Sequence, residues 1–496
     1  MDEPRTAGIA SALEALWPGL RLPALEAGAR LTLDSRQVGR GDVFVALPGR
    51  RCDGRDHIEG ARAQGAALIL AAAPFETSCE DVLVLEGLAE RLGELAALVF
   101  GVPEALEQIA VTGTNGKSSV THYIAALSEA LGTPCALIGT LGCGRLGALA
   151  DAGLTTPDPL SLQARLRALS DAGARRVALE ASSHALDQSR LSGCRLRAGV
   201  FTNLSRDHLD YHPGMAAYAA AKARLFRRPE LEVAVVNGDD PLARLMLAGL
   251  NASARIVRVG GDASNDFRVM RWQGRVDGLD ARLATPEGER DIALSLLGRF
   301  NLDNVLLAVA TLHALGAPLE ALWAAVETLR PVPGRMQRLS APGGPTVVVD
   351  YAHTPDALGS ALMALREHVP GRLWCLFGCG GERDPGKRAL MGEMAALMAD
   401  RVVVTDDNPR TEPAADIRRA ILDGCRAAGG EAVFEKVSEI PGRADAIART
   451  LAASAADDVI LLAGKGHETW QEINGVRHAF SDADVAGRAL EEYVHG

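Results

Sequence analysis

The most informative stretch of this chain is Val111-Thr112-Gly113-Thr114-Asn115-Gly116-Lys117-Ser118-Ser119. It follows the apolar run 108–111, which suits a buried parallel strand, and precedes 120–131, which has helical spacing without a breaker. Backbone N–H groups of a glycine-containing turn and a helix N-terminus favour bound phosphate, while the lysine reaches the outer phosphates and the first serine can hold magnesium. We therefore expect ATP and Mg²⁺ as cofactors, with nucleotide contacts from Gly113, Thr114, Asn115, Gly116, Lys117, Ser118 and Ser119.

The loop is not a regular G-x-x-x-x-G-K-[ST] sequence, because Val111 stands where the first glycine should be. An ordinary Gly/Asn turn before a helix is the alternative interpretation. The strand on one side and the helix on the other favour the phosphate loop.

Length and composition set outer limits on the function. At 496 residues the chain should hold about three domains. A net charge of −11 argues against a nucleic-acid partner, and aromatic residues at 4% argue against a platform for stacked bases. The N-terminus is acidic and no apolar stretch approaches the roughly 18 residues of a membrane helix, so we expect a cytoplasmic protein without membrane insertion. Eight scattered cysteines indicate neither a disulfide framework nor a zinc site.

The chain is predicted to be an α/β protein of three domains. Residues 1–103 form a small N-terminal α/β domain, 104–335 a central P-loop domain with a mostly parallel sheet, and 336–496 a C-terminal Rossmann-like domain. Short alternating runs between 254 and 297 predict a small antiparallel insertion. The sequence Arg330-Pro331-Val332-Pro333-Gly334 is a plausible linker, since prolines and glycine stop the preceding helix.

The C-terminal domain repeats one design four times, an apolar strand followed by a polar cluster and a helical segment. The strands are 346–349, 373–377, 401–405 and 459–463, and the clusters begin at Asp350, Gly380, Asp406 and Gly464. Ligands bind outside the carboxyl ends of the strands in open parallel sheets. We therefore expect all four clusters to line one crevice.

Further chemistry gathers in the central domain. Glu180 follows an apolar strand pattern, so its carboxylate should lie at a strand end and could hold a hard cation. The run 202–210 after the next strand contains His208, and two such clusters beside a phosphate loop suggest more than one magnesium ion. Lys222 lies in a helical pattern of small residues, where a solvated lysine would be the ordinary interpretation.

From end to end the chain resembles the Mur ligases, and within them the MurE type, which adds a diamino acid to a UDP-linked muramoyl dipeptide. Six separated motifs occur in the family's order: Asp34-Ser35-Arg36, the phosphate loop, Thr155-Thr156-Pro157, the run 180–184, Asp207-His208-Leu209-Asp210 and the C-terminal clusters. The resemblance implies a cytoplasmic ligase of peptidoglycan precursor synthesis that acts as a monomer.

The resemblance also implies roles around the nucleotide. Lys222 is similar to a carbamylated lysine that serves as a magnesium ligand, together with Ser118, Glu180 and His208. Asn301 and Asn304 resemble a pair near the adenine, and Asp350 a further nucleotide contact. Lys117, Lys222, His208 and Arg335 would be the catalytic residues, with Arg335 completing the ATP site after domain closure.

Substrate contacts follow from the same resemblance. Residues 1–103 would bind the UDP-substrate, and the contacts to the UDP-sugar-peptide would come from Leu33, Ser35, Thr155, Thr156, Ser183, Gln188 and Arg190. The amino acid would be held by Arg388, Asp407, Asn408, Pro409, Arg410, Gly464 and Glu468. Arg410 carries a planar fork that can grip a carboxylate, which meso-diaminopimelate has at the end of its side chain and lysine lacks. Glu468 suits the distal ammonium.

The expected reaction phosphorylates the D-glutamate γ-carboxylate with ATP, and the amine of meso-diaminopimelate then displaces phosphate from the acyl phosphate. Three alternatives stay open at this point. A folylpolyglutamate synthase shares the loop but not the leading domain or the Asp-Asn-Pro-Arg run. A ligase that recycles ready-made murein tripeptide, or a nucleotide-binding scaffold without turnover, would be identified by its substrate requirements.

Overall fold

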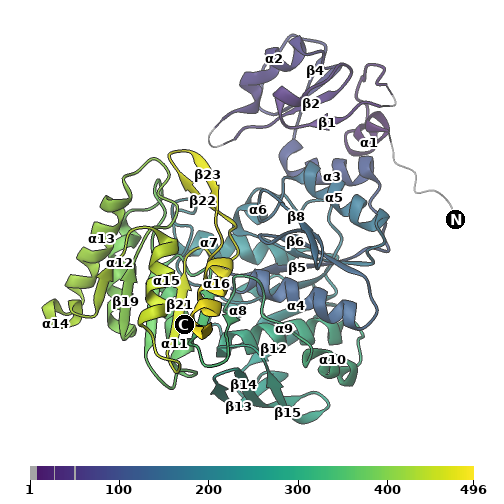
Figure 1. Cartoon of the computed structure of the whole chain (residues 1–496). Coiled ribbons are helices and arrows are strands. Elements are labelled where there is room, and N and C mark those ends of the chain that lie inside the picture. The colour runs from purple at the N-terminus through teal and green to yellow at the C-terminus, as the bar shows by residue number, and fades with distance from the viewer. Residues whose placement is uncertain (1–7, 27, 50–51, 496) are drawn as a thin grey trace. The chain divides into compact units, whose positions relative to one another are not determined.

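The computed structural model describes residues 8–26, 28–49 and 52–495 (Figure 1). Its described residues form two compact units. Unit 1 runs as far as Val257 and includes Thr311–Ala317, and unit 2 comprises Arg258–Ala310 and the chain from Pro318 onward. Within the described residues, no helix has both the length and the apolar composition needed to cross a membrane.

The N-terminal part of unit 1 is a parallel four-stranded sheet in the order β1-β2-β3-β4. Its strands are β1 (Leu31–Thr32), β2 (Val43–Ala46), β3 (Leu68–Ala72) and β4 (Val82–Leu85), and its helices are α1 (Ile9–Leu16), α2 (Ile58–Ala63) and α3 (Leu88–Phe100). Strands β2 and β3 are buried along their whole length, as expected for strands covered on both faces. The prediction of an α/β N-terminal part is confirmed.

The rest of unit 1 is built on the parallel strands β11-β10-β5-β9-β6, with β7 and β8 continuing antiparallel beyond β6. The strands are β5 (Glu107–Thr112), β6 (Cys135–Gly139), β7 (Gly142–Arg145), β8 (Ala148–Ala150), β9 (Arg176–Glu180), β10 (Leu196–Phe201) and β11 (Val233–Asn237). The helices are α4 (Lys117–Ala130), α5 (Pro159–Asp171), α6 (Ser183–Asp187), α7 (Met215–Ala223) and α8 (Ala243–Leu247). The predicted strand, loop and helix around Lys117 are confirmed.

Strand β12 (Arg255–Gly260) carries the chain into unit 2, where β13 (Phe267–Arg275), β14 (Gly278–Thr285) and β15 (Gly288–Leu294) pair antiparallel. This confirms the predicted antiparallel insertion. Helices α9 (Arg299–Ala314) and α10 (Leu319–Val326) follow it along the chain.

The last part of unit 2 is a sheet in the order β16-β17-β21-β18-β19-β20, parallel except for β16. Its strands are β16 (Gln337–Leu339), β17 (Thr346–Asp350), β18 (Leu373–Phe377), β19 (Arg401–Val404), β20 (Val437–Glu439) and β21 (Val459–Ala463), and a hairpin of β22 (Trp470–Ile473) and β23 (Val476–Ala479) follows. The helices are α11 (Pro355–Arg366), α12 (Gly386–Met398), α13 (Ala414–Ala427), α14 (Gly430–Phe434), α15 (Arg443–Ala453) and α16 (Asp482–His495). The four predicted strands are thus confirmed.

A buried ion pair ties the C-terminal helix to this sheet. The Arg443 guanidinium and the Asp482 carboxylate are both fully buried, 2.7 Å apart, and Asp482 is the first residue of α16. Arg443 also donates to the carbonyl of Ala463, the last residue of β21. Breaking such a pair leaves an uncompensated buried charge, so α16 is an integral part of the domain.

Candidate active site

The phosphate loop between β5 and α4 is shaped by two glycines. Gly113 and Gly116 have φ angles of 150° and 85°, and a Cβ at Gly113 would lie 1.8 Å from Thr202 Oγ1. The loop is held to the end of β10, since Thr114 N donates to the Asn203 carbonyl at 2.8 Å. The sequence therefore uses glycine where the backbone conformation and the close approach both require it.

Lys117 is the first residue of α4 and folds back over the loop. Its Nζ donates to the carbonyls of Gly113 and Thr114, both at 2.9 Å. The ammonium thus lies over the turn whose N–H groups and helix N-terminus attract phosphate.

Glu180 lies at the end of β9, with 2% of its surface exposed. Its Oε1 accepts hydrogen bonds from Ser118 Oγ at 2.9 Å and from Thr140 N at 2.8 Å. Two of the predicted metal ligands, Ser118 and Glu180, are therefore in direct contact. Thr140, whose hydroxyl also donates to Glu180 and hydrogen-bonds with the predicted substrate contact Thr155, was not predicted.

Lys222 on α7 is 1% exposed, and its Nζ donates to the Gly113 carbonyl at 2.7 Å. That carbonyl also accepts from Lys117, so two amines share one acceptor. Burial, and then the nearby positive charge of Lys117, lower the pKa of Lys222 well below its ordinary value. The solvated-lysine interpretation is thereby excluded, and the neutral form of the amine is more accessible here than in a solvated lysine.

His208 has a φ of 53°, which is uncommon for a non-glycine residue. Its Nε2 lies 3.3 Å from Asp207 Oδ2, and its ring centroid lies 4.9 Å from that of His184. Burial lowers the pKa of His208, opposed by Asp207, and the positive charges of Lys117 and Lys222 lower it further. Burial and then the charge of His208 lower the pKa of His184 to about 4. The structure thus places His208 beside His184 and Asp207, near enough to the two lysines for their charges to act on it.

The segment around α6 joins most of the predicted peptide contacts. Arg190 donates to Gln188 Oε1 at 2.7 Å and to the Thr156 carbonyl at 2.8 Å. Gln188 Nε2 donates in turn to the Tyr211 hydroxyl at 3.0 Å. The hydroxyl of Thr156 donates to the Glu180 carbonyl at 2.6 Å, so this side chain also links the segment to the end of β9.

The two predicted substrate contacts of the N-terminal part, Leu33 and Ser35, belong to the part of unit 1 that is built on the sheet β1-β2-β3-β4. Leu33 packs against the apolar core of that sheet. Ser35 opens a short 3-10 turn that is capped by the side chain of Asp34. The motif Asp34-Ser35-Arg36 therefore shapes a turn just beyond β1.

Arg335 and Asp350 belong to unit 2, and each contacts a residue next to the other in the chain. The Arg335 guanidinium lies 4.4 Å from the ring centroid of Tyr351. Asp350 accepts from Met336 N at 2.7 Å and from Ala352 N at 2.9 Å, which holds the backbone beside Arg335 in place. Burial raises the pKa of Asp350, and the charge of Arg335 opposes that rise.

Asn301 and Asn304 are both buried near the start of α9. Asn301 Nδ2 donates to the Leu297 carbonyl at 2.8 Å. Contacts therefore place this pair in unit 2, whereas the phosphate loop belongs to unit 1.

The Asp407–Arg410 loop follows β19 and is held on two sides. Arg410 has a φ of 54°, its Nη1 donates to the Gly381 carbonyl at 2.6 Å, and its N–H donates to the Glu472 carbonyl of β22 at 3.1 Å. Asn474 N donates back to the Arg410 carbonyl at 2.7 Å. A residue held in this sparsely populated conformation by surrounding contacts is typical of ligand sites.

Asn408 links this loop to the cluster after β21. Its Nδ2 donates to Glu468 Oε2 at 2.9 Å, and its Oδ1 accepts from Lys465 Nζ at 3.1 Å. Gly464 lies against Asp407, whose Oδ2 would be 2.6 Å from a Cβ at Gly464. Hydrogen bonds thus join the polar clusters after β18, β19 and β21, and Gly464 N donates to the carbonyl of Asp350, the last residue of β17, at 3.1 Å. That the four clusters line one crevice stays a prediction.

Arg388 lies near the start of α12 and is 7% exposed. Its guanidinium pairs with Glu412 at 2.9 Å. Sequence reasoning missed Glu412 and Glu472, because each acquires its partner only through folding, and it missed Lys465, which pairs with the nearby Glu468 and with the distant Asn408. A lysine between two glycines directly after a buried strand is the one local signal that pointed to Lys465.

Three predicted ligand contacts carry a buried polar atom without a hydrogen-bond partner among the described residues, namely Ser183 Oγ, Asn301 Oδ1 and Arg388 Nε. Buried polar groups are nearly always paired, so each such atom calls for a partner from outside the protein or from water.

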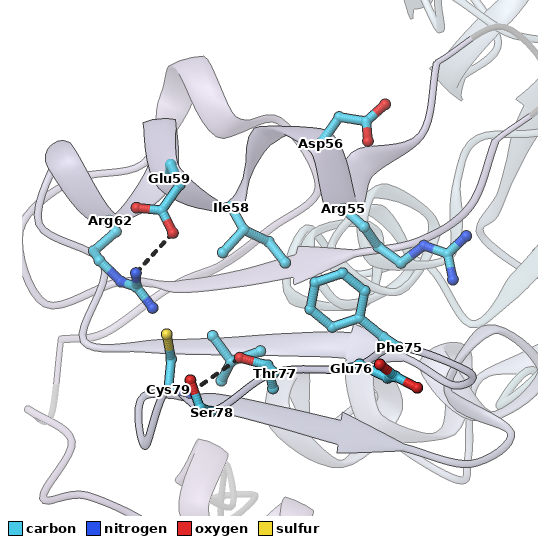
Figure 2. A pocket seen from close by; sticks show the side chains of 11 residues that line it. Arg55, Asp56, Ile58, Glu59, Arg62, Phe75, Glu76, Thr77, Ser78 and Cys79 are labelled. Carbon is cyan, nitrogen blue, oxygen red and sulfur yellow. Dashed lines mark hydrogen bonds and ion pairs between the residues drawn. The ribbon is translucent and has the colours of Figure 1, made fainter.

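A pocket of about 560 Å³ lies elsewhere, in the N-terminal part between α2 and the segment 75–79 (Figure 2). Its apolar surface comes from Ile58, Phe75 and Val82, and Arg62 lines it with its guanidinium already paired with Glu59 and Asp81. It contains none of the predicted site residues, so it is separate from the candidate active site.

Family models match most of the chain. The Mur ligase family catalytic domain matches residues 29–110, the Mur ligase middle domain 111–312, and the Mur ligase glutamate ligase domain 334–466. The chain belongs to the Mur ligase family. The predicted resemblance is thereby confirmed.

Close relatives within the Mur ligases share one name. The chain is 50% identical over 466 residues to the UDP-N-acetylmuramoyl-L-alanyl-D-glutamate–2,6-diaminopimelate ligase of Pseudomonas aeruginosa, covering 93% of this chain and 94% of that one. It is 45% identical over 488 residues to the ligase of that name from Xanthomonas campestris, covering 97% of both.

Comparison with solved structures indicates the same family. A ligase structure of the same name is 37% identical, with a TM-score of 0.72 and coverage of 98% of this chain and 99% of that one. A folylpolyglutamate synthase from Mycobacterium tuberculosis complexed with ADP is 21% identical, with a TM-score of 0.60, and covers 82% of this chain. At that identity the likeness shows the shared Mur ligase fold alone.

Proposed function

We propose that this Mur ligase joins meso-2,6-diaminopimelate to the D-glutamate γ-carboxylate of UDP-N-acetylmuramoyl-L-alanyl-D-glutamate, using ATP, in peptidoglycan precursor synthesis. The observation that carries the proposal is the identity of 45–50% to ligases of that name over more than nine tenths of the chain. The alternatives of a folylpolyglutamate synthase and a non-catalytic scaffold are thereby set aside.

The reaction proceeds through an acyl phosphate. A γ-carboxylate oxygen attacks the terminal phosphorus of ATP, and ADP leaves. The amine of diaminopimelate then attacks the acyl carbon, phosphate departs with the C–O bonding electrons, and the amine nitrogen loses its proton. Phosphoryl transfer depends mainly on positioning and charge stabilisation, and Lys117 suits the transferred phosphoryl group, because only the flexible end of its side chain must leave the two loop carbonyls.

The residues around Glu180 fit magnesium. A carboxylate and a hydroxyl, Glu180 and Ser118, are hard oxygen donors in direct contact. The described residues hold no group of three His, Cys, Asp or Glu side chains that would bind a metal by themselves, so the site would rely on the serine, on Lys222 and on nucleotide phosphates. When bound, Mg²⁺ neutralises developing charge on the phosphoryl oxygens.

We assign Lys222 as a carbamylated ligand and His208 as a further residue of this site. A neutral amine is the form that adds CO₂, with loss of one proton, and the lowered pKa of Lys222 favours that form. The product is anionic, so the charge of Lys117, which disfavours an ammonium at this position, would stabilise the carbamate. A carbamate carbon signal in ¹³C NMR after equilibration with ¹³CO₂ tests this assignment.

Arg410 and Glu468 would divide the distal end of diaminopimelate between them. The guanidinium suits the distal carboxylate and the Glu468 carboxylate suits the distal ammonium. The domain boundaries at 103 and 335, the binding of the UDP-substrate by residues 1–103, the monomeric state and the cytoplasmic location remain parts of this proposal.

Phosphate release provides the test. The enzyme is incubated with ATP, UDP-N-acetylmuramoyl-L-alanyl-D-glutamate and either meso-diaminopimelate or L-lysine, and the product mass is read in parallel. Turnover with diaminopimelate alone is expected. Turnover with lysine instead would overturn the role of Arg410, and turnover only with free murein tripeptide would identify a recycling ligase.

A further inference from the structure

Lys465 lies between β21 and the Glu468 side chain and has no exposed surface. Its Nζ donates to Glu468 Oε2 at 3.0 Å and to Asn408 Oδ1 at 3.1 Å. The rings of Trp470 and Phe480 lie 5.7 and 5.9 Å from Nζ. A fully buried ammonium is costly unless such partners compensate it, so its presence calls for a reason.

The lysine content of the chain sharpens that question. The sequence holds only five lysines, at 117, 222, 387, 436 and 465, among 52 basic residues, so arginine fills the other positions. Lysine is a compact point charge, whereas arginine presents a large planar fork. Lys465 is therefore one of the few positions at which this chain carries the compact cation rather than arginine.

The contacts of Lys465 determine the geometry of Asn408. Asn408 Oδ1 accepts both from Lys465 Nζ and from Glu472 N, while Nδ2 donates to Glu468 Oε2. The amide orientation is fixed because only an oxygen can accept from these two donors. Glu468 Oε2 thus receives two hydrogen bonds, from the ammonium and from the amide, and the carboxylate is held in one orientation.

We propose that Lys465 is a positioning residue of the amino-acid site: it fixes the Glu468 carboxylate and the Asn408 amide so that Glu468 meets the distal ammonium of the amino-acid substrate. Lys465 acts through Glu468 and does not touch the substrate. The inference rests on the proposed function, because that function supplies an amino acid with a distal ammonium. Such supporting hydrogen bonds hold a binding carboxylate within the narrow range of productive geometry.

The test compares two substrates that differ in one group. L-2-Aminopimelate has both carboxylates of diaminopimelate but lacks the distal amine. Wild-type turnover with meso-diaminopimelate is measured first, and its absence would refute the proposed function rather than this inference. In Lys465→Met we expect the KM for diaminopimelate to rise at least tenfold, with the KM values for ATP and the UDP-substrate within twofold. The kcat/KM for 2-aminopimelate should fall less than threefold.

Lys436→Met is the matched control. Lys436 is partly buried in the same unit and donates to the Ala399 carbonyl, away from Asn408 and Glu468. No KM should change by more than twofold in this variant. Equal losses for both amino acids in Lys465→Met, or an unchanged or lower KM for diaminopimelate, would overturn the inference.

A second variant keeps the test decisive if Lys465→Met fails to fold. Lys465→Met combined with Glu468→Gln leaves neither charge unpaired, so the double variant should fold. Because Lys465 acts through the Glu468 carboxylate, the double variant should discriminate between the two amino acids as Glu468→Gln alone does, within twofold. A further tenfold loss of kcat/KM for diaminopimelate in the double variant would show that Lys465 acts by another route.

Discussion

The phosphate loop and the amino-acid cluster are built in different ways. Lys117 is held by carbonyls three and four residues before it in the chain. In the amino-acid cluster, Arg410 reaches Gly381 across 29 positions and Asn408 reaches Glu468 across 60. The contacts of Lys117 are therefore local and are encoded by a short motif, although the loop itself also docks on the end of β10. The contacts of the cluster exist only once the sheet of unit 2 has formed.

Removal of the Lys117 side chain tests the phosphate loop, and it should have the largest effect on activity. Lys117→Ala takes away the only cation of the loop and should lower kcat about 10³-fold, since a group aimed at developing charge contributes on that scale. Steady-state phosphate release measures it. Lys436→Ala serves as the control with unchanged kcat, and a Lys117→Ala loss of less than tenfold would contradict the assignment.

A substitution of Arg410 tests the amino-acid cluster. Arg410→Lys keeps the charge but loses the fork, and a charge-assisted hydrogen bond contributes about 1.5–3 kcal/mol. We expect kcat/KM for meso-diaminopimelate to fall about 100-fold, with the KM for ATP unchanged. Arg419→Lys, at an exposed position on α13, is the control and should behave as wild type. Equal losses for ATP and diaminopimelate would show a general defect instead.

A substitution of Gly381 tests whether the amino-acid cluster depends on the close backbone approach at this position. A Cβ there would lie 2.0 Å from the Pro409 carbonyl oxygen, so the Asp407–Arg410 loop must move in Gly381→Ala. We expect a loss of roughly 1–3 kcal/mol in unfolding free energy, together with a raised KM for diaminopimelate. Gly487→Ala is the control, because nothing lies within 4 Å of its Cβ and it is helical; it should gain about 0.5–1 kcal/mol.

The smallest expected effect is a change in stability with pH, which arises in unit 1 and not in the amino-acid cluster. Burial lowers the pKa of His122 on α4 to about 4. As the pH falls below about 6.5, this histidine becomes protonated in the unfolded chain but stays neutral in the folded chain. The free energy of unfolding therefore decreases between pH 6.5 and 4, by up to about 3 kcal/mol. Urea unfolding at pH 7 and pH 4.5 should show a smaller drop in His122→Gln. The exposed His478→Gln should retain the full drop.

The sequence predicted locally marked features, such as the phosphate loop, better than contacts between distant segments, such as those of the amino-acid cluster. The strand, loop and helix around Lys117 and the four strands of the C-terminal sheet were readable, because apolar runs and turn residues mark them locally. The placing of Glu180 at a strand end followed from the same pattern. Which side chains meet was readable only as far as strand ends share one edge of a sheet.

The parts that could not be predicted depend on pairing between distant segments. Glu412 pairs with Arg388 across 24 positions, and Glu472 reaches the Asp407–Arg410 loop from a hairpin whose own sequence gives no sign of that docking. The positive φ of His208 and Arg410 was equally invisible, since neither residue type demands it. Surrounding contacts impose these conformations.

The ion pair between Arg443 and Asp482 makes a segment that follows the last motif of the family necessary for the fold. A stop codon at position 482 would delete the carboxylate and leave the guanidinium buried beside the end of β21, directly before Gly464 and Lys465. A nonsense mutation that spares every motif of the family should therefore still behave as a null allele.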